Sequence, residues 1–255
     1  MTWQFDLATN IGGRAEQQDR VEVLTMPDRT DEHLVILADG MGGQQQGALA
    51  AQTVIDTARR EFPRLDGSDP RQFLTGLCLD AHAAIRKTGL QNNTNPASTC
   101  TALYLKGDEA YWIHAGDSRL YHFETGNLVS RTCDHTVAEL LTDGNDAIPA
   151  DNRLYMCLGG QNDLEPEFGA TAVGDKDWFL LCSDGFWSQM TEAELTEDPS
   201  NPKARQTTAS DLVAMAARRA GSGGDNVSLV LVRARQSPAK SAWRRLFQPA
   251  LGIGR

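Results

Sequence analysis

The 255-residue chain carries 34 acidic and 24 basic side chains, a net charge of -10 and a sequence pI near 4.9. This acidic balance opposes the basic surface that phosphate-backbone binding requires, so we expect no nucleic-acid partner. The length is near the upper limit for one hydrophobic core. We therefore predict one domain over residues 1–235, followed by a basic tail over 236–255. From Arg233 to Arg255 there are six Lys or Arg and no Asp or Glu, which is typical of a solubilising tail or a segment that docks to a partner or an anionic membrane.

The five cysteines are widely spaced and form no C-x-x-C pair, a pattern that indicates neither a disulfide framework nor a zinc knuckle. The N-terminus has no basic and apolar leader, and 18 apolar residues run together nowhere. We expect a cytoplasmic monomer without a transmembrane segment.

Three short strands are expected first, over residues 3–9, 21–26 and 33–38, because they combine β-branched or alternating apolar residues with Gly, Pro or Asp at their ends. Apolar residues at helical spacing then predict a helix over 51–62 and a second one beginning near Asp69-Pro70, a capping residue followed by proline. These two helices should pack together.

Strand patterns return over residues 99–105, 110–115, 119–123 and 128–131, with a helix over 135–143 and an exposed loop over 144–152. The unbroken apolar runs 178–182 and 227–232 indicate central strands covered on both faces. Between them Ser210-Asp211 should cap a helix, and 198–208 should form a polar loop. Strands and helices occur in blocks, so we predict an α+β fold with antiparallel sheets covered by helices.

Several aspartates follow apolar runs and adjoin glycine: Asp39-Gly40, Gly116-Asp117 and Asp184-Gly185. Asp225 directly precedes the last apolar run, and Asp19 precedes the second strand. Any one Asp-Gly step most often marks only a turn. Together, however, they place carboxylates at the ends of core strands, where they can converge.

Convergence would be electrostatically costly, because two carboxylates about 4 Å apart repel by about 4 kcal/mol at an effective dielectric of 20. A bound cation removes that cost. Oxygen-only ligation favours Mg²⁺ or Mn²⁺, and two such ions form a known arrangement for phosphoester hydrolysis.

Seven segments resemble the motifs of the metal-dependent protein phosphatases of the PPM, or type 2C, family, in the family's order. They are residues 13–19 (GRAEQQD), 38–43 (ADGMGG), 97–99 (AST), 115–119 (AGDSR), 134–136 (DHT), 182–185 (CSDG) and 224–226 (GDN). The resemblance implies a sandwich of two antiparallel β-sheets flanked by pairs of antiparallel helices.

The resemblance also implies roles for individual residues. Asp39, Asp184 and Asp225 match direct ligands of a binuclear Mn²⁺ or Mg²⁺ centre, with the Gly40 carbonyl as a further ligand. Asp19 matches an outer ligand, and Asp117 matches a carboxylate that helps Asp184 to hold a third, weaker metal in bacterial members. Arg14 matches the arginine that grips the substrate phosphate, for which its planar fork is suited.

The implied activity is hydrolysis of phosphoserine and phosphothreonine in a phosphorylated protein, opposing a Ser/Thr kinase. The resemblance further implies that a water activated by the two metals would attack phosphorus in line, so that no nucleophilic side chain would be needed.

Two departures from the family pattern bear on this activity. Gln18 replaces an acidic outer-shell residue, and Met41 stands where some members carry a histidine proposed as general acid. His135 could donate instead, although a structural role is the commoner one for such a histidine. These departures support the alternative of a catalytically weak, phosphoprotein-binding regulatory module. A two-metal nuclease is disfavoured by the acidic composition.

Overall fold

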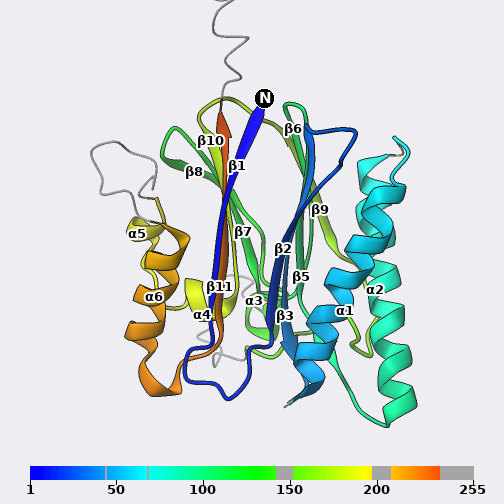
Figure 1. The fold of residues 1–255 in the computed structure, drawn as a ribbon. Helices are drawn as coiled ribbons and strands as arrows, with labels where there is room; N and C mark the ends of the chain where they lie inside the picture. The colour runs from blue at the N-terminus through cyan, green and yellow to red at the C-terminus, as the bar shows by residue number, and fades with distance from the viewer. Residues whose placement is uncertain (44, 68, 142–151, 197–207, 236–255) are drawn as a thin grey trace, which may run out of the picture.

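Two antiparallel sheets pack face to face and helices cover both outer faces in the computed structural model (Figure 1). The structure describes residues 1–43, 45–67, 69–141, 152–196 and 208–235. The 236–255 tail and most of the expected loops 144–152 and 198–208 lie outside these residues. The layers run helix, sheet, sheet, helix, which confirms the predicted α+β sandwich.

The first sheet has the strand order β1-β11-β10-β7-β8. Its strands are β1 (Thr2–Asn10), β7 (Arg119–Glu124), β8 (Asn127–Arg131), β10 (Asp177–Cys182) and β11 (Val227–Arg235). β10 and β11 are the two unbroken apolar runs, and they occupy the centre of this sheet as expected. Their central position directs the residues that follow β10 and precede β11 to one end of the sheet.

The second sheet has the order β2-β3-β5-β6-β9, with the short strand β4 paired to β3. Its strands are β2 (Asp19–Thr25), β3 (Glu32–Met41), β4 (Ala97–Ser98), β5 (Cys100–Lys106), β6 (Glu109–Ala115) and β9 (Glu167–Ala172). The sequence patterns did not predict β9, whose burial is only partial along its length. It pairs with β6 at the edge of the sheet.

The space between the sheets is filled by aliphatic and aromatic side chains from both. Val35, Leu37 and Leu103 of the second sheet are fully buried in the same cluster as Phe179 and Val230 of the first. The other face of β10 and β11 is buried in a second cluster under the helices on that side. Both strands therefore have two buried faces, which explains why apolar and polar residues do not alternate in their sequences.

Helices α1 (Gln45–Glu61) and α2 (Pro70–Asn92) cover the second sheet, on the right in Figure 1. The side chain of Asp69 accepts the Arg71 N–H at 3.0 Å and caps α2, as its sequence predicts. The helix α3 (Val137–Leu141) lies within the expected segment 135–143. One 3₁₀ turn, Phe62–Arg64, follows α1, and a second, Gly221–Gly223, lies between the helix over 209–220 and β11.

The first sheet is covered by α6 (Ala209–Ala220) with the short helices α4 (Asp184–Trp187) and α5 (Glu192–Thr196), on the left in Figure 1. The capping prediction for α6 was wrong in register. Thr208 is the N-cap, and Asp211 is the third residue of a reciprocal capping box. Ser210 lies inside the first turn.

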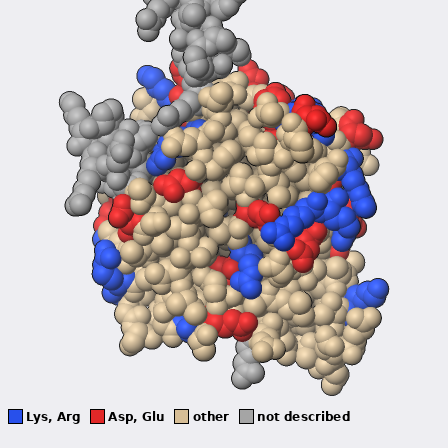
Figure 2. Space-filling view, viewed as in Figure 1, with Lys and Arg blue, Asp and Glu red and all other residues tan. Residues whose placement is uncertain are grey.

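No helix in the described residues is long and apolar enough to cross a membrane. On the face that Figure 2 shows, acidic and basic side chains are interspersed over a mostly uncharged surface.

Candidate active site

The register between β2 and β3 brings the first two predicted site residues together. Asp19 at the start of β2 is the direct cross-strand partner of Asp39 near the end of β3. Both side chains are therefore held by rigid, hydrogen-bonded strands. Gly40, the next residue of β3, pairs with Ser98 of β4. A Cβ at Gly40 would lie 2.0 Å from the carbonyl oxygen of Gly47, so glycine allows α1 to begin directly against the site.

Two further aspartates arrive from the first sheet. Asp184 is the first residue of α4, directly after β10, and Asp225 lies just before β11. A Cβ at Gly185 would lie 2.1 Å from the carbonyl oxygen of Asn226, which shows how closely the two segments approach. The adjacent central strands of the sheet thus place these carboxylates at the same end of the sandwich.

Hydroxyl groups hold this end of the sandwich in position. The Asp39 N–H donates to Thr99 Oγ1 at 2.9 Å, and Thr99 in turn bonds to the Ser118 hydroxyl at 2.8 Å. From the other sheet, Ser183 Oγ donates to Asp19 Oδ2 at 2.9 Å. This last bond links the two sheets across the site.

Burial and mutual repulsion raise the pKa of these carboxyl groups. Burial, with the charge of Asp184 adding to it, raises the pKa of Asp19 to about 6. Burial raises the pKa of Asp39 well above its usual range, and the charges of Asp19 and Asp184 raise it further. The pKa of Asp184 is raised by burial and then by Asp225. The convergence expected from the sequence is therefore present, with its electrostatic cost.

Asp117 extends the acidic site from the turn between β6 and β7. Burial raises its pKa to about 7, and the charges of Asp184 and Asp134 act in the same direction. Asp225 differs from the others because Arg14 Nη2 donates to its Oδ2 at 2.6 Å, with both side chains partly exposed. The predicted phosphate-binding arginine therefore lies at the rim of the acidic site.

The donor chemistry fits divalent cations that prefer oxygen. Asp19 Oδ1 and Asp184 Oδ1 are both buried and accept no hydrogen bond within the described residues. Such oxygens are costly to bury unless a cation or a proton joins them. Within the same residues, no three His, Cys, Asp or Glu side chains lie close enough together to bind one metal ion. The carboxylates thus converge on one region without enclosing a single point.

Three residues discussed from the sequence take no part in the carboxylate cluster. The backbone N–H of Gln18 donates to the Asn226 side chain at 2.8 Å, which ties the start of β2 to the start of β11. Met41 is half-buried at the end of β3. The buried ring of His135 accepts the Gly116 N–H at Nδ1, at 3.1 Å, and so supports the turn that carries Asp117. This contact is structural.

A cavity of about 690 Å³ opens beside the carboxylates. Arg14, Asp117, Asp184 and Asp225 line it, together with residues that follow α4 and precede β11. Its walls carry acidic and basic groups side by side. The acidic groups can bind metal cations, and the cations and the basic groups can together bind an anion.

One supporting pair at this cavity was not predicted. Arg119 donates to both carboxylate oxygens of Asp134, at 2.8 and 2.6 Å, and its guanidinium carbon lies 3.4 Å from the centroid of the Trp187 ring. The Trp187 Nε1–H donates to the Asp117 carbonyl at 2.9 Å. Arg119 and Asp134 both lie in the motif segments 115–119 and 134–136, which is the feature of the sequence that could have indicated these contacts.

The sandwich and its acidic end match a known family. The model of the family described as "Protein phosphatase 2C" matches residues 9–217. The chain belongs to this family.

Individual relatives agree with the assignment. The chain is 30% identical to the serine/threonine protein phosphatase PstP of Mycobacterium tuberculosis over 210 residues, which cover 78% of this chain and 40% of PstP. It is 26% identical to the protein phosphatase PhpP of Streptococcus pneumoniae over 93% of this chain and all of PhpP.

A solved structure of the PstP catalytic domain in complex with two manganese ions superimposes with a TM-score of 0.78. The two sequences are 27% identical, and the match covers 92% of this chain and 99% of that one. The match spans less than half the length of PstP itself.

Proposed function

We propose that this chain hydrolyses phosphoserine and phosphothreonine in proteins at a binuclear Mn²⁺ or Mg²⁺ centre, and so opposes a Ser/Thr kinase. The observation that carries the proposal is the convergence of Asp19, Asp39 and Asp184, two of which have a buried carboxylate oxygen that accepts no hydrogen bond within the described residues. PstP, a relative, has been solved with two manganese ions.

The metal ligands in this proposal are Asp39, Asp184 and Asp225, with the Gly40 carbonyl. Asp19 is an outer ligand in this proposal, held beside Asp39 by their strand pairing and fixed by its hydrogen bond from Ser183. Asp117 and Asp184 would share a third, weaker cation. When bound, the cations neutralise the carboxylates and the phosphate and make water a better nucleophile.

Arg14 binds the phosphate in this proposal. Its guanidinium is held at the rim by Asp225 and remains more than half exposed, so further N–H groups can donate to phosphate oxygens. Asp225 would thus both bind a metal and hold the arginine that binds the substrate phosphate. This arrangement would place the phosphorus next to the acidic site.

The decisive experiment measures hydrolysis of p-nitrophenyl phosphate and of a phosphothreonine peptide with Mn²⁺, with Mg²⁺ and with EDTA. We expect turnover with either metal, none with EDTA, and recovery when Mn²⁺ is added back in excess. Hydrolysis in EDTA at the same rate as with Mn²⁺ would refute the metal mechanism.

A second readout separates the enzyme from the regulatory module. Calorimetric titration of the metal-free protein with Mn²⁺ should show at least two sites, and Asp39→Asn should remove the tighter binding. A protein that binds Mn²⁺ and the phosphopeptide but hydrolyses neither substrate would be a binding module of the same fold.

A further inference from the structure

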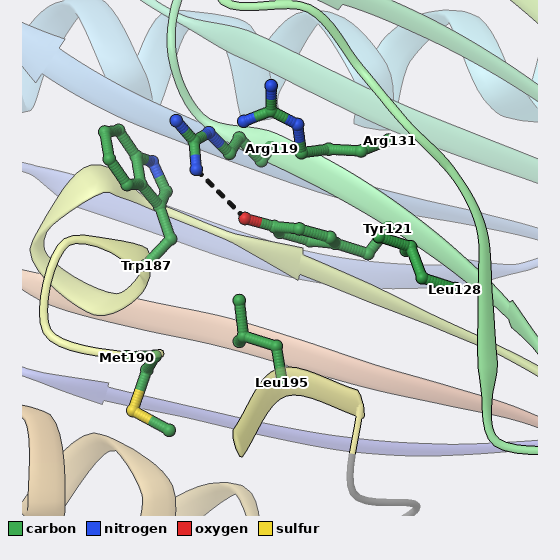
Figure 3. Close-up of a pocket in the computed structure, with 7 residues that line it drawn as sticks. All are labelled: Arg119, Tyr121, Leu128, Arg131, Trp187, Met190 and Leu195. Atoms are coloured by element: carbon green, nitrogen blue, oxygen red, sulfur yellow. Dashed lines mark hydrogen bonds between the residues drawn. The ribbon is translucent and has the colours of Figure 1, made fainter. Parts of the chain in front are cut away.

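A second pocket of about 380 Å³ lies directly behind one wall of the candidate active site. Arg119 and Trp187 line both cavities. The remaining lining comes from Tyr121 on β7, Leu128 and Arg131 on β8, Met190 between α4 and α5, and Leu195 on α5 (Figure 3). A bound peptide whose phosphate lies in the first cavity can therefore reach the second pocket past the wall formed by these two residues, Arg119 and Trp187.

The shared wall is rigid. The Arg119 guanidinium donates twice to Asp134 and once to the Tyr121 hydroxyl, at 3.1 Å, while its face stacks on Trp187. Its charge is thus satisfied within the protein. Arg119 forms the wall, and it is not the group that would attract a ligand.

The pocket is lined by polar and apolar groups in about equal share, and the Tyr121 hydroxyl is one of the polar groups. Figure 3 shows the Tyr121 hydroxyl facing Arg119, with Leu195 and Met190 on the opposite side of the pocket. Tyr121 is only 3% exposed. Burial raises its pKa to about 12, so the hydroxyl keeps its proton. Among the described residues it accepts from Arg119 and donates to none, which leaves one buried donor for a ligand.

The charge of this pocket is opposite to that of the chain. Its lining contains two arginines and no carboxylate, although the chain carries a net charge of -10. Arg131 is exposed and forms no ion pair within the described residues. A pocket that combines the apolar side chains of Leu128, Met190 and Leu195 with an exposed cation complements a segment that has a bulky apolar side chain and a neighbouring carboxylate.

We propose that this pocket docks the phosphoprotein substrate, taking a bulky apolar side chain near the phosphorylated residue while Arg131 pairs with an adjacent acidic residue. The proposal rests on the proposed function and adds a substrate class to it. A basic segment fits less well, because the exposed Arg131 would repel it and no carboxylate lines the pocket.

The test compares phosphothreonine peptides in an otherwise neutral sequence. An Asp-Leu pair is placed at successive positions on either side of the phosphothreonine, with matched Lys-Leu and Asp-Ser series. The measured quantity is kcat/KM for each peptide divided by kcat/KM for p-nitrophenyl phosphate, which is too small to reach the second pocket. We expect wild-type protein to prefer Asp-Leu over Lys-Leu by about tenfold at one placement, as for a salt-sensitive contact at the rim of an interface.

Arg131→Glu should abolish or invert that preference, and 0.5 M NaCl should weaken it. Arg86→Glu is the matched control, because Arg86 is an exposed arginine on α2, across the sandwich; it should leave the preference unchanged. Replacing Leu by Ser in the peptide should cost several-fold in the same ratio.

The outcomes are distinct. Equal ratios for all peptides, or a preference that survives Arg131→Glu, would overturn the docking proposal while hydrolysis of p-nitrophenyl phosphate still supports the phosphatase. If the protein hydrolyses nothing, fluorescence anisotropy of the labelled peptides measures the same preference as binding. A change in sedimentation with Arg131→Glu and no change in peptide preference would assign the pocket to a second copy and overturn the proposal.

Discussion

Asp134 is buried against Arg119, which neutralises it through two N–H donors, whereas Asp19, Asp39 and Asp184 are buried against one another. Both groups lie at the same end of the sandwich, yet their electrostatic situations are opposite. In the matched pair, Arg119 and Asp134, the attraction between the two charges offsets the cost of removing them from water. The carboxylate cluster destabilises the fold unless protons or cations bind to it.

The contrast separates a structural use of buried charge from a functional one. Removing one partner of the matched pair leaves an uncompensated charge, so stability should fall. Removing one member of the cluster relieves repulsion, so stability in the absence of metal should rise while activity disappears. Opposite signs of this kind are characteristic of a site that gives up stability for function.

The largest effect is expected for Asp39→Asn, which keeps the shape of the side chain and removes its charge. We expect kcat/KM with Mn²⁺ to fall by at least ~10³-fold, equivalent to about 4 kcal/mol of transition-state stabilisation. In EDTA the midpoint of thermal unfolding should rise, because Asp39 is repelled by Asp19 and Asp184.

Asp56→Asn is the control for this substitution, since Asp56 is an exposed residue of α1. It should change neither activity nor the EDTA unfolding midpoint. Near-normal turnover by Asp39→Asn would remove Asp39 from the ligand set. A lower unfolding midpoint in EDTA would contradict the account of repulsion.

The second effect tests the matched pair. Arg119→Ala should lower the free energy of unfolding by about 3 kcal/mol, because Asp134 is left buried without its partner. Urea unfolding in EDTA measures this change. Arg59→Ala breaks the more exposed pairs with Glu22 and Asp56 and should cost less than about 1 kcal/mol. Equal costs for the two variants would show that burial of the Arg119 pair is energetically irrelevant.

Much of this comparison could be predicted from the sequence. Apolar runs ending in Asp-Gly steps locate Asp39 and Asp184 at the ends of core strands. The register of β2 against β3, which places Asp19 opposite Asp39, was not predicted and is seen only in the structure. The sandwich followed from the block order of strands and helices and from the family motifs. The edge strand β9 escaped because its residues neither alternate cleanly nor form an apolar run.

The second half of the comparison could not be predicted in the same way. Arg119 and Asp134 are 15 residues apart, and no local pattern indicates that their side chains meet. The stacking of Arg119 on Trp187 depends on how α4 packs against β7, which belong to distant parts of the chain. Periodicity locates elements, but pairings across the fold arise from their tertiary packing.

The third prediction concerns pH. The folded-state pKa of Asp19 is about 6, above its ordinary value of 3.8, so the folded protein binds more protons than the unfolded chain between these pH values. Its contribution to stability is present below pH 4 and is lost as pH rises through 6. In EDTA, the difference in unfolding free energy, wild type minus Asp19→Asn, should therefore fall by about 1–3 kcal/mol from pH 4 to pH 7.

Using this difference cancels an opposing group. Burial lowers the pKa of His114 to about 3, so the folded protein is destabilised as pH falls below 6.5 and the unfolded histidine gains a proton. Saturating Mn²⁺ should remove the Asp19 effect, since a cation competes with the proton. A difference that stays flat from pH 4 to pH 7 in EDTA would show that Asp19 is not under repulsion.

The smallest effect is expected at the rim, where Arg14 meets Asp225 with both side chains partly exposed. Arg14→Ala should raise KM for a phosphopeptide by about tenfold and change kcat little, because a grip on the phosphate acts in the ground state and the transition state alike. Arg14→Lys should recover only part of the loss, since an ammonium cannot donate in a planar fork. Arg64→Ala, which removes an exposed arginine beside α1, serves as the control. An unchanged KM in Arg14→Ala would assign Arg14 to the structure of the rim, and a fall in kcat alone would instead indicate contacts made only in the transition state.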